Sequence, residues 1–342
     1  MIKVGIVGLG GMGRTHIKLI KECDGIDVVA ASEIDIERIK KTEPSCDFTI
    51  YKDLDVFLRI DDLDYVIVST PNHTHEEIAI KALSAGKNVI IDKPMTVDYE
   101  SALRIFNEAQ KATKDVFVFH SRRWDPDFLK IIEIINSGML GDLLEIQSSL
   151  YYKIWDYKNI GDTKAWRLDK DGGGILMDWA PHLIDQILLL MNSDPVHVYG
   201  LTQQSVKNSC IDDYFLGILE FEDNIFCKIE ARNNERLKVP RWYIVGTKGT
   251  LLVENKKRYK WDEIIIEYED ENGEEVKRKF ELPDARTLSE DIYKDFVKFV
   301  KGEKDKFIDI DESMRVMKIM DLIRLSSTEK GLLEYNYSLS IH

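Results

Sequence analysis

The fold is decided by the first thirteen residues of the chain, MIKVGIVGLGGMG. The run Ile2–Val7 is apolar and rich in β-branched residues, which is typical of a buried strand. Gly8–Gly13 follows at once with the spacing G-x-G-x-x-G, and a helical pattern extends over Met12–Cys23. Strand, glycine turn and helix in this order predict a unit whose helix N-terminus faces the negative charge of a dinucleotide.

The same alternation continues to about residue 120. Short apolar runs and amphipathic helical patterns follow each other, as in a parallel sheet covered by helices on both faces. The predicted strands are Val28–Ala31, Tyr65–Ser69, Val89–Ile91 and Val116–Phe119, and the helices are Ile36–Thr42, His75–Ala85 and Tyr99–Ala112. We therefore predict an α/β Rossmann domain over 1–120, with a doubly wound parallel sheet.

The pattern changes after Ser121. Helices are predicted near 126–137, 175–191, 289–301 and 311–325, and a strand near 143–153. Alternating segments with turns between them are predicted near 196–203, 214–221, 225–231, 242–245, 250–254 and 263–268. Alternation of this kind predicts strands with one covered face. We expect residues 121–342 to form an α+β domain with a large, mainly antiparallel sheet.

Composition excludes several classes of function. A net charge of −14 argues against nucleic acid, since phosphate binding needs a basic surface. The four cysteines lie far apart, without a C-x-x-C pair, which argues against a zinc knuckle or a disulfide framework. The longest apolar run on a predicted helix, Ile187–Met191, is too short to span a bilayer. A cytoplasmic protein with no nucleic-acid or membrane partner is expected.

The glycines have separate roles in the predicted cofactor site. Gly8 permits the tight turn, Gly10 lets the backbone approach the pyrophosphate, and Gly13 lets the helix pack against the strand. Glu33 ends the second strand, where it can accept hydrogen bonds from ribose hydroxyls and repel a 2′-phosphate. NAD is therefore the predicted cofactor, with NADP as the alternative because Arg38 could turn toward a phosphate.

The loops at the carboxyl ends of later strands complete this site, because ligands bind there in open α/β sheets. His73 and His75 form an H-x-H pair, but no further ligands lie at metal spacing, so no metal is predicted. The predicted cofactor-binding residues are Gly8, Gly10, Gly11, Met12, Gly13, Glu33, Thr70, Pro71, Asn72, His73, His75, Asp92 and Lys93.

The catalytic candidates come from both halves of the chain. Lys93 follows a strand, and a lysine there can hold a substrate hydroxyl and favour its alkoxide-like transition state. Asp178 and His182 are four residues apart on one predicted helix face, after the glycines 172–174. A histidine can take a proton near neutral pH, and a carboxylate one turn away can orient it. A plain loop at Lys93 and a buried structural histidine are the alternatives.

These motifs, in this order and separation, resemble the glucose–fructose oxidoreductase, inositol dehydrogenase and rhizopine-catabolism (Gfo/Idh/MocA) family over essentially the whole chain. Within the family, Arg122–Phe128 and Ala165–Arg167 look closest to scyllo-inositol-type dehydrogenases. The resemblance implies that His182 is the base, that Lys93 binds the hydroxyl, and that an open sheet builds a homodimer or homotetramer. Two positions depart from the family pattern: Asp92 replaces the usual Glu, and Ala180 replaces a common Gly.

The resemblance implies an NAD(P)-dependent dehydrogenase that moves a hydride between nicotinamide and a secondary alcohol of a polyol, inositol or sugar. Two alternatives are an NAD-assisted glycosidase of the same family and a non-catalytic dinucleotide- or sugar-sensing regulator. The chain retains all three catalytic candidates, which argues against the regulator. The predicted substrate-binding residues are Lys93, Arg123, Trp124, Tyr152, Trp166, Arg167, Asp178 and His182.

Overall fold

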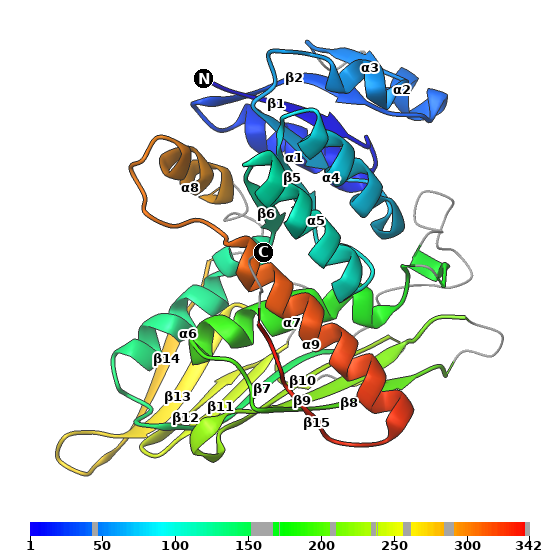
Figure 1. Cartoon of the computed structure of the whole chain (residues 1–342). Coiled ribbons are helices and arrows are strands. Elements are labelled where there is room, and N and C mark those ends of the chain that lie inside the picture. Colours follow the sequence, from blue (N-terminus) through cyan, green and yellow to red (C-terminus); the bar gives the residue numbers. More distant parts are fainter. Residues whose placement is uncertain are drawn as a thin grey trace. The chain divides into compact units, whose positions relative to one another are not determined.

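The computed structural model describes residues 1–42, 47–151, 167–170, 172–205, 210–233, 237, 239–255, 261–283 and 291–338. The chain forms two compact units, which are coloured along the sequence in Figure 1. The first unit comprises Met1–His120 and Glu290–Met317, and the second comprises Ser121–Ser289 and Lys318–His342.

The first unit contains a parallel sheet of six strands in the order β3-β2-β1-β4-β5-β6. Its strands are β1 (Ile2–Val7), β2 (Ile26–Ser32), β3 (Thr49–Tyr51), β4 (Tyr65–Val68), β5 (Asn88–Asp92) and β6 (Val116–Phe119). The strand order reverses next to β1, which pairs with β2 on one side and with β4 on the other. Ligands of open α/β sheets bind at the carboxyl ends of the strands at such a reversal.

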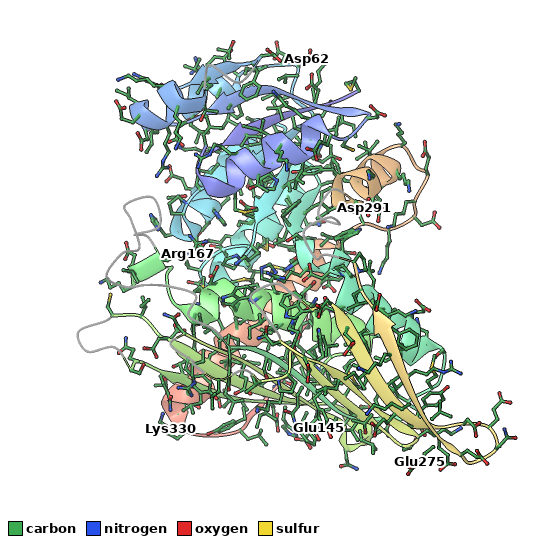
Figure 2. All side chains as sticks on the ribbon, turned by 180° about the vertical axis from the view of Figure 1, so that it is seen from behind. Asp62, Glu145, Arg167, Glu275, Asp291 and Lys330 are labelled. Atoms are coloured by element: carbon green, nitrogen blue, oxygen red, sulfur yellow. The ribbon has the colours of Figure 1, made fainter. Side chains whose placement is uncertain are left out.

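Helices cover both faces of this sheet. They are α1 (Gly11–Lys21), α2 (Ile36–Thr42), α3 (Leu54–Leu58), α4 (His75–Ser84), α5 (Tyr99–Ala112) and α8 (Asp291–Val300). α4 and α5 lie on the near face in Figure 1, whereas α1 and α8 lie on the near face in Figure 2, which is seen from behind. All four residues of β4 are buried, as are all four of β6, as expected for strands covered on both sides.

The segment that carries α8 comes from late in the chain and packs on the first unit through aromatic rings. The ring centroids of Tyr65 and Phe296 are 5.0 Å apart. The ring centroid of Phe117 is 5.6 Å from that of Phe299 and 5.4 Å from that of Phe307. Residues 290–317 therefore belong to the first unit, although they lie within the range 121–342 expected for the second domain.

The second unit is built on a sheet of nine strands in the order β14-β13-β12-β11-β7-β10-β9-β8-β15. They are β7 (Leu143–Tyr151), β8 (His197–Gln203), β9 (Tyr214–Glu220), β10 (Phe226–Arg232), β11 (Trp242–Gly246), β12 (Gly249–Val253), β13 (Glu263–Glu269), β14 (Glu275–Glu281) and β15 (Leu333–Glu334). β7 and β10 pair in parallel, and the other pairs are antiparallel. The predicted fold class, a Rossmann domain with a mainly antiparallel α+β domain, is confirmed.

One face of the large sheet is covered by helices. Figure 1 shows α6 (Pro126–Asn136), α7 (Ile175–Met191) and α9 (Ile310–Glu329) on that face. On β10, Cys227, Ile229 and Ala231 are fully buried, whereas Lys228 and Arg232, on the opposite face, are partly exposed and Glu230 between them is buried. Strand alternation therefore separates a packed face from an open one. No helix among the described residues is both long and apolar enough to cross a membrane.

Candidate active site

The glycine-rich turn joins β1 to α1. Gly8 has a φ of +94°, a left-handed conformation that favours glycine. A Cβ atom on Gly13 would lie 1.9 Å from the carbonyl oxygen of Gly8, so the helix can approach the strand only without a side chain there. Cβ atoms on Gly10 or Gly11 would meet nothing within 4 Å among the described residues. The first amides of α1 thus border open space that suits a pyrophosphate.

Glu33 lies directly after β2 and is almost fully buried, at 4% exposure. The backbone N–H of Leu9 donates to its Oε2 at 2.8 Å, and the backbone N–H of Asp35 donates to its Oε1 at 2.9 Å. The carboxylate therefore holds the glycine-rich turn against the loop after β2. A ribose hydroxyl, the predicted partner of Glu33, would have to donate to a carboxylate oxygen that already accepts a hydrogen bond from the backbone.

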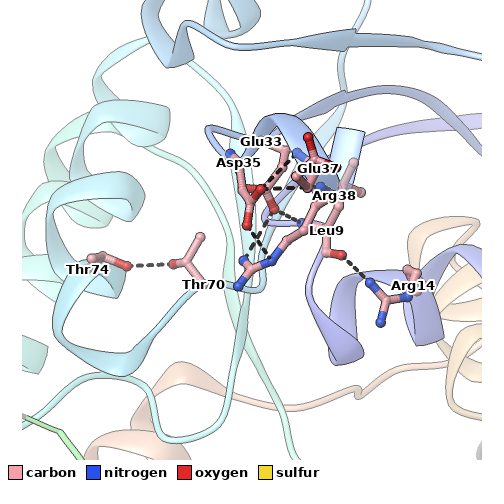
Figure 3. Close-up of polar contacts among 8 residues, drawn as sticks. All are labelled: Leu9, Arg14, Glu33, Asp35, Glu37, Arg38, Thr70 and Thr74. Atoms are coloured by element: carbon pink, nitrogen blue, oxygen red, sulfur yellow. Dashed lines mark hydrogen bonds and ion pairs between the residues drawn. The ribbon is translucent and has the colours of Figure 1, made fainter. Parts of the chain in front are cut away.

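Arg38 lies between two carboxylates at the start of α2 (Figure 3). Its Nη1 is 3.7 Å from Oε2 of Glu33, and its Nε is 3.3 Å from Oδ2 of Asp35. The other oxygen of Asp35 accepts from the backbone N–H of Glu37 at 2.9 Å, which caps the helix. The guanidinium thus offsets part of the negative charge that led us to predict NAD.

The loop after β4 carries the next group of predicted cofactor residues. Thr70 and Pro71 are partly exposed, Asn72 is buried and His73 is exposed. His75 is fully buried, with Nε2 2.9 Å from the carbonyl oxygen of Thr70 and Nδ1 3.0 Å from that of Pro94. His75 therefore connects the loops after β4 and β5 to each other.

Burial is the main influence on His75 and lowers its pKa. The imidazole is then neutral at physiological pH and donates to one of the two carbonyl oxygens at a time. The two histidines of the H-x-H pair have different surroundings, since His73 is exposed. No group of three or more His, Cys, Asp or Glu side chains in the described ranges could hold a metal ion.

Asp92 is the last residue of β5 and faces inward. Its Oδ1 is 2.9 Å from Nε2 of His16, and its Oδ2 accepts from Oγ of Ser69 at 2.5 Å. Burial alone would raise the pKa of Asp92, but the charge and hydrogen bond of His16, with the hydrogen bond of Ser69, outweigh it and hold the pKa below its usual value. Lys93, the next residue, is partly exposed at the end of the strand.

In the second unit, α7 starts at Ile175, immediately after the glycines 172–174. Gly174 has a φ of +99°, and a Cβ there would lie 2.2 Å from Oδ1 of Asp212. Oδ2 of Asp212 accepts from the backbone N–H of Leu176 at 2.7 Å, so this carboxylate caps α7. Pro181 lies inside α7, six residues after its first residue.

The predicted face of α7 carries Asp178, His182 and Asp185. Asp178 is partly exposed, and its Oδ2 is 3.9 Å from Nε of Arg167. His182 is 7% exposed, with its ring centroid 5.8 Å from that of Trp179. Asp178 and His182, which are expected to act together, are four residues apart in α7 and therefore lie on one face of the helix.

The predicted substrate residues differ in their surroundings. Arg123 forms a bidentate pair with Asp185, with Nη2 2.5 Å from Oδ1 and Nε 2.9 Å from Oδ2. This pair gives Arg123 a structural partner, and a substrate role for it stays a prediction. Trp124 is partly buried in a 3-10 turn (Ser121–Trp124), and Arg167, labelled in Figure 2, is partly exposed. Tyr152 and Trp166 lie outside the described residues.

Comparison with known proteins identifies the family. A family model described as "Oxidoreductase family, NAD-binding Rossmann fold" matches residues 2–120, and one described as "GFO/IDH/MocA C-terminal domain" matches residues 128–252. The chain belongs to the Gfo/Idh/MocA family. The resemblance expected from the motifs is confirmed, and so is a nicotinamide dinucleotide as the family's cofactor.

Three relatives show how close the similarity is. The chain is 32% identical to the scyllo-inositol 2-dehydrogenase (NADP(+)) IolW of Bacillus subtilis over 64% of its own length and 60% of that protein. It is 25% identical to the myo-inositol 2-dehydrogenase of Thermotoga maritima, covering 88% of this chain and 89% of that one. The crystal structure of an NAD-binding protein from Listeria innocua matches with a TM-score of 0.85 and 29% identity, over 97% and 96% of the two chains.

The alignments with the curated relatives at 32–33% identity cover less than two thirds of the length of each relative. The alignments span 62%, 56% and 60% of the lengths of the first three of them. Membership of the Gfo/Idh/MocA family is therefore established for the fold and the cofactor class. The reaction and substrate of this member require a separate argument.

Three residues at the site were missed by the sequence analysis. His16 lies on the buried face of α1 beside Ile17 and Ile20, and a histidine at an apolar position is a signal that could have been noticed. Asp212 lies 36 residues beyond Leu176, and Tyr293 lies 277 residues beyond His16. No local pattern indicates contacts over such separations.

Because Asp212 caps α7, we expect its replacement to change the stability of the protein by an amount that depends on pH. Burial raises the pKa of Asp212 to about 6, so the folded protein holds this proton more tightly than the unfolded chain does. Between the unfolded pKa and pH 6, the contribution of Asp212 to the free energy of unfolding falls as the pH rises. In Asp212→Asn, the amide oxygen can still accept from Leu176 without carrying a charge.

We therefore expect the stability of Asp212→Asn relative to the unmodified protein to increase as the pH rises from about 4 to about 6. After allowance for solvent screening, the gain is about 1–2 kcal/mol. Thermal midpoints measured across this range check the expectation, with the exposed Asp223→Asn as control. Parallel midpoint-against-pH curves for Asp212→Asn and the unmodified protein would contradict it.

Proposed function

We propose that this protein is an NAD(P)-dependent oxidoreductase that transfers a hydride between nicotinamide and a secondary alcohol of a polyol, inositol or sugar. The observation that carries the proposal is the glycine turn after β1. Gly8 and Gly13 are packed so closely that a side chain is excluded, whereas Gly10 and Gly11 border open space at the N-terminus of α1. Such a cradle suits the pyrophosphate of a dinucleotide.

The bound dinucleotide supplies the hydride acceptor at its nicotinamide ring. Gly8, Gly10, Gly11, Met12 and Gly13 would hold the pyrophosphate, with Glu33 at the ribose end. Thr70, Pro71, Asn72 and His73 line the next loop at the carboxyl edge of the sheet, and His75 acts behind them as the link between loops. Asp92 supports this edge from within, because both of its oxygens are already engaged.

The chain's own residues handle the proton. In the direction of oxidation, Lys93 binds the hydroxyl oxygen and stabilises the negative charge that develops on that oxygen as the hydroxyl proton is removed. His182 accepts the hydroxyl proton, and Asp178 orients His182 or the substrate. In the direction of reduction, His182 returns the proton to the alkoxide oxygen. These roles follow the family resemblance and agree with the exposure of Lys93 and Asp178.

The substrate class rests on the relatives. The two curated relatives aligned above are named as inositol dehydrogenases. An alcohol carried on a ring with several hydroxyls is accordingly the proposed substrate. Arg123, Trp124, Tyr152, Trp166 and Arg167 remain the predicted substrate-contacting residues.

The test is the appearance of reduced nicotinamide absorbance with a panel of inositols, sugars and sugar acids, supplied with NAD or NADP. A cofactor-dependent rise with one substrate, lost in His182→Ala, supports the proposal. No reaction with either cofactor, despite dinucleotide binding, would overturn the dehydrogenase assignment. Cofactor that copurifies tightly without net reduction would then favour the NAD-assisted glycosidase.

We expect Arg38 to affect the relative affinities of the protein for NAD and NADP. Its guanidinium lies near the carboxylates of Glu33 and Asp35, and without it their charge would repel a 2′-phosphate more strongly. We expect Arg38→Ala to shift the ratio of NADPH to NADH dissociation constants by about tenfold in favour of NADH, or roughly 1.4 kcal/mol.

The dissociation constants can be measured by titration of nicotinamide fluorescence. Lys40→Ala is the matched control, because Lys40 is on the same helix but pairs with Glu37 at 2.9 Å. An Arg38→Ala protein in which both cofactors weaken equally would exclude Arg38 from the choice.

The open face of the large sheet suggests a homo-oligomer. Apolar side chains on strands of that face remain partly exposed, among them Tyr199, Leu216, Ile218, Tyr243 and Ile265. Apolar side chains that stay exposed on one face of a sheet are typical of an interface. A solution mass of two or four chains by light scattering supports this assembly, and a monomer at micromolar concentration contradicts it.

A further inference from the structure

A buried imidazole lies beneath the loops that carry the proposed active site. His16, on α1, is 0% exposed. Its Nε2 is 2.9 Å from Oδ1 of Asp92, and its Nδ1 is 2.6 Å from the hydroxyl oxygen of Tyr293 on α8. The ring also meets Phe119 edge to face, with centroids 4.5 Å apart and an interplanar angle of 73°. Partners on three sides thus determine the plane of the imidazole.

The hydrogen-bond directions in this cluster follow from the carboxylate. An ionised carboxylate only accepts, so Nε2 of His16 must carry a proton to bond Asp92. The hydroxyl of Ser69 donates to the other oxygen of Asp92. The hydroxyl of Tyr293 can donate to or accept from Nδ1, so this contact is satisfied whether or not Nδ1 is protonated. Each polar group of the cluster therefore has a compatible partner.

The cluster joins the elements that carry the cofactor and catalytic candidates. His16 belongs to the helix that follows the glycine turn, and Ser69 immediately precedes Thr70. Asp92 immediately precedes Lys93. The carboxylate of Asp92, the last residue of β5, thus accepts hydrogen bonds from α1 and from the residue directly after β4.

The Asp at position 92 gives this cluster a specific geometry. Its Oδ1 contacts Nε2 of His16 and its Oδ2 accepts from Ser69, so both carboxylate oxygens are occupied beneath the strand ends. Removal of either donor would leave a buried charge with too few hydrogen bonds. The backbone at the end of β5 would then rearrange, and Lys93 is the first side chain beyond it.

We propose that His16 is a positioning residue for Lys93, which acts through Asp92, and that Tyr293 fixes the imidazole of His16 in the required orientation. This inference rests on the proposed function for the catalytic role of Lys93. It assigns the C-terminal segment a part in the active site, because Tyr293 belongs to α8.

The first test compares His16→Leu, His16→Gln and Tyr293→Phe with the unmodified protein. His16→Leu is expected to lower kcat about 100-fold with a smaller change in KM, since it removes the donor to Asp92. His16→Gln can restore a donor near the Nε2 position and should recover at least about tenfold of that loss. Tyr293→Phe should lower kcat by roughly 3- to 10-fold. The exposed Lys18→Ala, on the same helix, is the control and should match the unmodified protein.

The outcome of this series is decisive for the inference. A folded His16→Leu protein with unchanged kcat overturns it. So does a His16→Gln protein that is no better than His16→Leu, because the hydrogen bond to Asp92 would then not matter. Recovery in His16→Gln supports the inference, since a purely structural role for ring volume would not be rescued by an amide.

Two further readouts do not depend on catalysis. The rate of reductive methylation at Lys93, followed by mass spectrometry without cofactor, should change in His16→Leu and return toward normal in His16→Gln. An unchanged rate overturns the inference even if no substrate is ever found, whereas a changed rate with no activity on the panel rejects only the proposed function. Nitrogen-15 spectra of the unmodified protein should show a proton on Nε2 of His16, and an imidazole protonated only on Nδ1 would overturn the inference without any variant.

Discussion

Replacement of Lys93 by methionine is expected to lower kcat by about two to four orders of magnitude, which is the range for removal of a group that stabilises charge in a transition state. Methionine keeps much of the length of the side chain and removes its charge. The dissociation constant for the dinucleotide should change by less than about threefold, because a cofactor held mainly by the glycine turn loses little binding energy.

Steady-state assays with the substrate found by the panel, together with cofactor titrations, check this expectation. Lys111→Met is the control, since Lys111 is an exposed lysine of α5 in the same unit and pairs with Glu108. A Lys93→Met protein with nearly normal turnover would remove Lys93 from the mechanism. Equal losses of turnover and dinucleotide affinity would instead assign Lys93 mainly to cofactor binding.

Two glycines of the same turn are expected to give opposite results when each is changed to alanine. In Gly13→Ala the new methyl group would lie 1.9 Å from the carbonyl oxygen of Gly8, so the backbone must move. We expect the free protein to lose about 3 kcal/mol of stability, the upper part of the range for overpacking. In Gly10→Ala the methyl group meets nothing within 4 Å in the part of the chain that the structure describes, so the free protein should keep its thermal midpoint.

Dinucleotide affinity separates the two variants further. The methyl group of Gly10→Ala projects into the space proposed for the pyrophosphate, and we expect the dissociation constant to rise at least about tenfold. Thermal unfolding of the free protein and fluorescence titration with NADH provide both measurements. A Gly10→Ala protein that binds NADH normally would show that the pyrophosphate lies elsewhere.

The sequence predicted the parts of the fold that have strong periodicity. The strand expected at Val116–Phe119 and the helix expected at Tyr99–Ala112 have those bounds in the structure. β3 has three residues and α3 has five, which is too short for a period to be visible. β14 has the sequence EVKRKFE, whose charges conceal a strand. All seven of its residues pair with β13, and Lys277 lies opposite Glu267 in that register and forms an ion pair with it.

The site shows the same division between local and distant information. The glycine turn, the acid after β2 and the face of α7 are local patterns, and the structure places each on the expected element. The partners of these residues are not local. The hydrogen bond from Leu9 to Glu33 spans 24 residues, and the contact of His16 with Asp92 spans 76. Tertiary packing decides such pairs, and a single sequence contains no period that reports them.

The late position of α8 has a consequence for how the chain matures during synthesis. Domains generally fold from the N-terminus as the ribosome extends the chain by about 5–20 residues per second. The rings of Tyr65 and Phe117 are complete in the chain after residue 120, but their partner Phe296 is added about 170 residues, or roughly 10–30 s, later. During that interval the nascent first unit exposes an apolar patch that α8 will cover. Until α8 emerges, this patch is therefore available for aggregation or for binding by chaperones.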